Sequence, residues 1–267
     1  MVKAKDIYDR FATVMLSIGS TTNFWNSFLS NSLQQLTERE PSPIYYFDSI
    51  FSVFDTDIST GMGYLRTDLG KKFTIDKSNA PDRLKEFQNG IRCLYLIRII
   101  HEAELAILRM IQQLDFPAKK DPLESMNAFH NIEDAIMKQL PNGTQYQIVE
   151  YLKDKSETLK TYLEEKKECM ISSPESLYQM LKIIRNSVVH NGSILDTNRK
   201  ARITSDPRIL SYFEFFFETR LEADGEMIIM KDGDCYQHLL SLIRNFIVDI
   251  IKFLAGENDL AFLNFGT

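Results

Sequence analysis

Residues 181–192 read LKIIRNSVVHNG, an apolar helical run that carries Arg, Asn and His within six positions and then meets a glycine. Apolar residues recur at helical spacing, at Leu177, Leu181, Ile184 and Val188. This period predicts a helix with one face in the core. Gly192 suits the left-handed conformation that ends many helices, and Asn191 also tolerates it. We therefore expect His190 in the last turn of a packed helix, which begins near Ser173 with Pro174 at its first position.

The three polar residues near the end of this helix suit cleavage of RNA without a metal ion. An imidazole can take a proton from a 2′-hydroxyl or give one to a leaving 5′-oxygen, and the helix dipole favours protonated His190. The guanidinium of Arg185 can hold a phosphate and offset the charge that grows on it. Asn186 shares a face with His190 and can hold a phosphate oxygen or orient the imidazole. The competing interpretation is that Arg185 and His190 are ordinary surface and capping residues.

One helix supplies only one histidine, whereas in-line cleavage works better with two acid–base groups. A two-fold pair of these helices would supply both. We therefore expect a homodimer.

The sequence from Arg185 to His190 resembles the Arg-Asn-x3-His signature of the HEPN superfamily. A short insert and a final amphipathic helix follow, as in HEPN proteins, and the resemblance covers roughly residues 83–255. It implies an α-helical bundle that dimerises with the two motifs facing across a cleft. Many HEPN proteins are metal-independent ribonucleases in toxin–antitoxin, abortive-infection or other anti-phage systems. The resemblance makes His190 the acid–base group, Arg185 the phosphate binder and Asn186 the supporting polar residue.

One position departs from this family pattern. HEPN toxins that are paired with a nucleotidyltransferase antitoxin often carry a tyrosine two residues after the histidine, where this chain has Gly192. We therefore do not expect the protein to be silenced by modification of that tyrosine.

The composition narrows the functional classes. The chain has 267 residues, of which 44% are hydrophobic, so it can bury a substantial core as one large domain or two small ones. A net charge of −6 argues against a broad surface for duplex DNA but leaves room for a local RNA cleft. Three widely spaced cysteines show no metal-binding spacing. We expect no metal, no cofactor and no membrane span in a cytoplasmic protein.

The pattern predicts a mainly α fold with two regions. Residues 1–80 form an N-terminal helical extension, with one or two helices over 3–37 and an irregular segment after 41. Residues 81–267 form an HEPN-like helical bundle. Its expected elements are helices over 81–115, 123–140, 144–168, 173–192 and 235–254, with a β-hairpin over about 212–231 before the last helix.

Two further groups of residues are candidates for the site. Glu102 and Glu104 lie in an apolar part of the 81–115 helix, where either can pair with Arg185 or orient His190, or can be a surface residue. Arg199, Lys200 and Arg202 follow the motif in what reads as a basic loop, which is well placed to contact an RNA backbone.

These patterns together predict a homodimeric, metal-independent endoribonuclease of HEPN type that leaves a 2′,3′-cyclic phosphate. A toxin or anti-phage role would bring an antitoxin or defence-system partner. The alternative is a non-catalytic HEPN-like module that binds a partner protein or a nucleotide. A third possibility is a structural helical adaptor in which Arg185 pairs with a local carboxylate.

Overall fold

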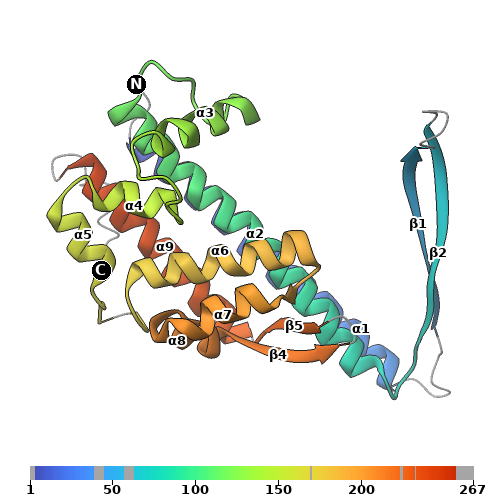
Figure 1. The fold of residues 1–267 in the computed structure, drawn as a ribbon. Coiled ribbons are helices and arrows are strands. Elements are labelled where there is room, and N and C mark those ends of the chain that lie inside the picture. Colours follow the sequence, from blue (N-terminus) through green and yellow to red (C-terminus); the bar gives the residue numbers. More distant parts are fainter. Residues whose placement is uncertain are drawn as a thin grey trace. The chain divides into compact units, whose positions relative to one another are not determined.

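The computed structural model describes residues 4–38, 45–56, 63–168, 170–222, 225–231 and 233–256. The chain divides into two compact units, Met1–Ser20 with Ile91–Thr267, and Thr21–Gly90. The described part of the chain is predominantly helical (Figure 1), which confirms the predicted mainly α fold. No helix in the described ranges is both long enough and apolar enough to cross a membrane.

The elements of the larger unit follow one another as helices interrupted by short strands. They are the first part of α1 (Ala4–Glu38), most of α2 (Ala80–Asp115), α3 (Met126–Met137), α4 (Gln147–Lys153), α5 (Glu157–Glu164), α6 (Pro174–Asn191), β3 (Ile194–Leu195), α7 (Thr197–Ser205), α8 (Pro207–Phe216), β4 (Phe217–Glu222), β5 (Gly225–Met230) and α9 (Gly233–Ala255).

Side chains of α2, α6 and α9 meet in one core, to which the start of α1 also contributes. Leu108 of α2, Ile184 of α6 and Ile243 of α9 are fully buried. Burial of each such side chain contributes about 1.5–3 kcal/mol relative to exposure. The core therefore fixes α2 against α6, the helix that ends in the Arg-Asn-x3-His motif.

The strands of this unit form a small antiparallel sheet in the order β3-β5-β4. Phe217 of β4 pairs with Met230 of β5, and Ile194 of β3 pairs with Met227. The predicted hairpin over 212–231 is wrong at its start, because residues 212–216 belong to α8. Four residues at helical spacing are buried there instead, namely Ile209, Tyr212, Phe213 and Phe216. Packing of this face outweighs the strand preference of the aromatic residues.

Local interactions decide the form of two other predicted segments, and one of the two predictions is wrong. The expected 144–168 helix is divided into α4 and α5, and the side chain of Ser156 caps α5 by accepting from the amide of Leu159. The one or two helices expected over 3–37 are a single helix, since α1 is continuous. Helical hydroxyls can bond to the carbonyl four residues earlier, as those of Thr13 and Ser32 do. Polar residues therefore do not have to interrupt this helix.

The smaller unit contains an antiparallel strand pair where we expected an irregular segment after residue 41. β1 (Tyr45–Thr56) pairs with β2 (Gly63–Ile75), with a register shift between Asp48 and Ile50. β1 is rich in Tyr, Phe, Ile and Val, the residue types that favour strands. This unit extends from Thr21 to Gly90, so the predicted division at residue 80 does not coincide with it.

Candidate functional site

The motif helix has the capped ends that its sequence predicts. The hydroxyl of Ser173 accepts from the amide of Ser176 at 3.3 Å, and Pro174 occupies the first turn. At the other end Gly192 adopts the left-handed conformation, with φ 58° and ψ 38°, and its amide donates to the carbonyl of Ser187. The predicted helix over 173–192 is confirmed, and His190 lies in its last turn.

The motif residues of α6 lie along its open side. Arg185 and Asn186 are half-buried and His190 is exposed, whereas Ile183, Ile184 and Ser187 are buried. At about 100° per residue, Asn186 lies about 40° around the helix from His190 and Arg185 about 140° from it. Lys182 falls between Arg185 and Asn186 on this side. We call Lys182, Arg185, Asn186, Val189 and His190 the α6 stripe.

Arg185 is held by a carboxylate from α2. Its Nη1 lies 2.6 Å from Oε2 of Glu104, whose side chain is only 2% exposed. Pairing of Arg185 with Glu104 was one of the alternatives that the sequence left open for this glutamate, and the contact is present. A buried carboxylate is a costly group unless hydrogen bonds satisfy it, so Glu104 is a fixed anchor for the guanidinium.

Two further donors complete the environment of Glu104. Its Oε1 accepts from Nζ of Lys182 at 2.6 Å and from the hydroxyl of Tyr178 at 3.0 Å. Burial, together with the charge of Glu104, raises the pKa of Tyr178 well above its usual value, so its hydroxyl stays a donor. The sequence reasoning missed Tyr178 and Lys182. The signal was their spacing, seven and three residues before Arg185 on one helix face.

Arg185 keeps unused hydrogen-bonding capacity. A guanidinium carries five N–H donors, and Nη1 to Glu104 is the only polar contact that Arg185 makes within the described residues. Its side chain is 28% exposed. One edge of the guanidinium is thus anchored, while the other N–H groups remain for an incoming anion.

His190 is exposed, and within the described part of the chain its imidazole has no hydrogen bond or ion pair. The turn after it is fixed by neighbouring residues. Asn191 donates to Oδ2 of Asp196 at 3.0 Å, and Oδ1 of Asp196 accepts from the amide of Arg199 at 2.8 Å. That backbone hydrogen bond and the charge of Arg199 lower the pKa of Asp196. The imidazole is therefore accessible at the end of a firmly terminated helix.

The predicted basic loop is a helix, α7, for which Asp196 is the N-cap. Arg199 pairs with Asp196, and Lys200 pairs with Glu226 of β5. Arg202 donates to the hydroxyl of Tyr146 and lies over its ring, 5.1 Å from the centroid. All three cations that we expected to face RNA thus have partners within the protein. The predicted loop is wrong, because this segment is helical, and its contact with RNA stays a prediction.

Glu102 does not join Glu104. Helical residues two positions apart are separated by about 200°, so Glu102 and Glu104 face nearly opposite sides of α2. Glu102 lines a narrow crevice with Ile7 and Phe11 of α1. It has no polar contact with Arg185 or His190 among the interactions of the described residues. Of the two supporting candidates, the structure brings only Glu104 to the motif.

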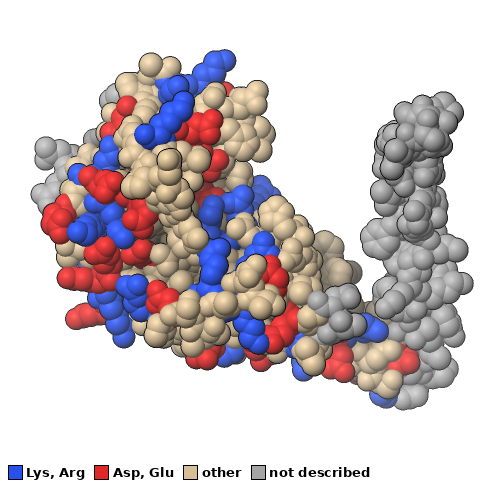
Figure 2. Space-filling model, viewed as in Figure 1, with Lys and Arg blue, Asp and Glu red and all other residues tan. Residues whose placement is uncertain are grey.

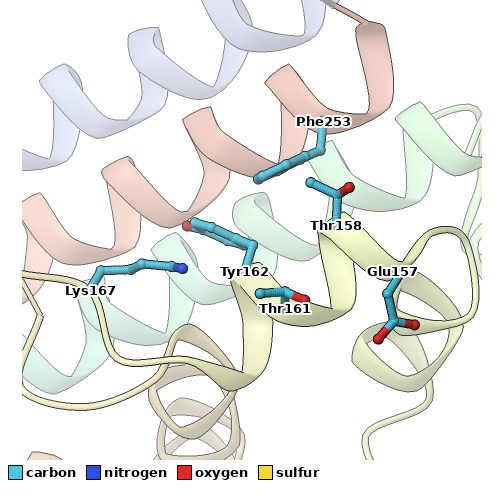
Figure 3. Close-up of a pocket in the computed structure, with 6 residues that line it drawn as sticks. All are labelled: Glu157, Thr158, Thr161, Tyr162, Lys167 and Phe253. Atoms are coloured by element: carbon cyan, nitrogen blue, oxygen red, sulfur yellow. The ribbon is translucent and has the colours of Figure 1, made fainter.

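A pocket on the described surface can be compared with the motif as a candidate site. An open pocket of about 380 Å³ between α5 and α9 is lined by Tyr162, Lys167 and Phe253 among others (Figure 3). The hydroxyl of Tyr162 donates a hydrogen bond to Oδ2 of Asp249 at 2.8 Å. No motif residue lines the pocket. Among the described residues, no group of three or more His, Cys, Asp or Glu side chains is placed to hold a metal ion.

Charged side chains of both signs are interspersed on the face of the molecule seen in Figure 2. This mixture agrees with the net charge of −6, and no broad basic surface is seen on that face. Any anion bound there would be held by a few local cations.

No family model, no curated protein and no solved structure matches this chain.

Proposed function

We propose that the protein is a metal-independent endoribonuclease of HEPN type that acts as a homodimer. The observation that carries this proposal is that one helix, α6, presents both an anchored cation and a free imidazole. Arg185 is fixed through one N–H group by buried Glu104, and His190 is exposed and unpaired within the described residues. These are the groups that cleavage of a phosphodiester next to a 2′-hydroxyl requires.

The proposed reaction uses one His190 from each subunit. One imidazole takes the proton of the 2′-hydroxyl as the 2′-oxygen attacks phosphorus. The bond from phosphorus to the 5′-oxygen breaks, and the partner subunit's His190 gives a proton to that oxygen. Arg185 binds the non-bridging oxygens and offsets their growing charge. The products are a 2′,3′-cyclic phosphate and a 5′-hydroxyl.

The test is cleavage of an unstructured RNA by purified protein in the presence of EDTA, with analysis of the RNA termini. We expect 2′,3′-cyclic phosphate ends, and we expect His190→Ala and Arg185→Ala to lose at least about 100-fold in rate. Matched controls are His130→Ala, an exposed histidine of α3, and Arg208→Ala, an exposed arginine of α8. Equal losses in the controls, or cleavage that survives both motif substitutions, would exclude the proposal.

A toxin or defence role is the cellular setting that we propose for this activity. Expression in a bacterial host should arrest growth, and His190→Ala should abolish the arrest. Growth arrest that persists in the His190→Ala strain would separate the toxicity from RNA cleavage.

One observation favours the third possibility, a structural helical module in which Arg185 pairs with a local carboxylate. The ion pair between Arg185 and Glu104 joins α2 to α6, and it needs no ligand to do so. In that case Arg185→Ala should lower the free energy of unfolding, while His190→Ala should change neither stability nor any binding activity. Loss of cleavage in a stably folded His190→Ala protein distinguishes the ribonuclease from this module.

A further inference from the structure

We infer that Lys182 is a phosphate-binding residue, and that RNA lies along the α6 stripe with one phosphate at Arg185 and His190 and a neighbouring phosphate at Lys182. This inference rests on the proposed function. It adds a binding residue outside the Arg-Asn-x3-His motif, and it gives the path that the RNA strand follows along α6.

The position of Lys182 on the helix is the first support. Taking about 100° and 1.5 Å per residue, Lys182 lies between Arg185 and His190 around α6, about 60° from one and about 80° from the other. It also lies about 12 Å before His190 along the axis. A strand that follows the stripe away from the scissile phosphate at His190 therefore passes over Lys182.

The contacts of Lys182 are the second support. Its Nζ donates to Oε1 of Glu104 at 2.6 Å, and its side chain is 23% exposed. An ammonium group has three donors, so two remain after this contact. The anchor that fixes Arg185 thus also fixes Lys182, and both cations keep donors for phosphate oxygens.

The local charge balance is the third support. A single buried carboxylate, Glu104, is shared by two cations. Among the described residues, Glu133 of α3 also interacts electrostatically with Lys182, but it is not hydrogen-bonded to it and faces His130 at 3.4 Å. Two cations backed by a shared buried carboxylate form a site that gains from a bound anion.

The experiment measures binding separately from cleavage. Full-length His190→Ala protein is titrated with a short, unstructured fluorescent RNA at several KCl concentrations. In this background Lys182→Met should weaken binding about tenfold at low salt and reduce the slope of log affinity against log salt by about 0.7, the value for one single-strand phosphate contact. Lys182→Arg should restore both. Lys160→Met, which removes a lysine from α5, should change neither.

The same substitutions in the cleaving protein give a second readout. We expect Lys182→Met to raise KM about tenfold and to leave kcat within about twofold, because the residue binds a phosphate that does not react. An unchanged KM and an unchanged salt slope overturn the inference. A loss of affinity that Arg does not restore and that lacks the change in slope also overturns it, since a folding defect would produce that result.

These outcomes separate the two proposals. If the wild-type protein cleaves RNA and Lys182→Met keeps its KM and slope, the ribonuclease stands and the role of Lys182 fails. If nothing is cleaved but Lys182→Met lowers affinity and slope, the role of Lys182 stands as RNA binding and the ribonuclease fails. Absence of RNA binding at every salt concentration overturns both.

Discussion

Arg185 of α6 and Glu104 of α2 form an ion pair in which Nη1 and Oε2 are 2.6 Å apart and the glutamate side chain is 2% exposed. The two residues are separated by 81 positions in the sequence. Because the carboxylate cannot move into solvent without disrupting the core, it determines where the guanidinium lies. The pair therefore links the packing of two helices to the geometry of the motif.

Glu104→Gln should lower the free energy of unfolding by about 1–3 kcal/mol. The substitution removes a buried negative charge that accepts hydrogen bonds from Tyr178, Lys182 and Arg185. Urea denaturation followed by circular dichroism measures the change. Glu102→Gln, on the opposite face of α2, is the matched control and should stay within about 0.5 kcal/mol. Equal effects of the two substitutions would contradict the assigned role of Glu104.

Gly192→Ala should destabilise the protein by about 1 kcal/mol. Gly192 ends α6 at φ 58°, a conformation that an alanine side chain disfavours. Gly90→Ala is the control, because Gly90 lies inside α2 with open space around a new methyl group, where alanine favours the helix. We expect thermal unfolding to show opposite signs for the two changes. A stabilised Gly192→Ala protein would be inconsistent with the left-handed cap.

Asp196→Ala should destabilise the protein at pH 7 by about 1 kcal/mol, through loss of the α7 cap. The folded-state pKa of Asp196 is below its ordinary value of 3.8, so the contribution is present above that pH and is lost as pH falls through the folded pKa. The difference in unfolding free energy between wild type and variant should therefore shrink below about pH 4. A difference that grows on acidification would contradict this sign.

Cys93 should react slowly with thiol reagents. It is 2% exposed, and burial raises the pKa of its thiol to about 11, so very little thiolate is present at pH 8. Cys235 is only half-buried and should be alkylated before Cys93. Peptide mass spectrometry after timed treatment with iodoacetamide gives the two rates. Faster labelling of Cys93 than of Cys235 in the native protein would show that this part of α2 opens readily.

The features that are local in the chain could be predicted from the sequence. Ser173, Pro174 and Gly192 set the ends of α6 because each acts on a backbone group within a few residues of itself. The apolar period of the same segment predicted its buried face. The accessible His190 in the last turn follows from these two facts together.

The features that depend on distant residues could not be predicted in the same way. The aromatic run from Tyr212 to Phe216 favours a strand by composition, yet it is helical because its buried face packs into the core. Similarly, the sequence does not show that Lys200 meets Glu226 or that Arg202 meets Tyr146, because these partners are distant in the chain.

The sequence by itself determined the helical class, the limits of α6 and the residue types at its end, because hydrophobic period and helix capping act over a few residues. Only the tertiary structure decided which of two glutamates, 102 or 104, meets the motif, and that Lys182 shares this carboxylate with Arg185. The physical reason is rotational. Which side of α2 faces α6 depends on how both helices pack into a common core. That packing depends on contacts with residues throughout the larger unit.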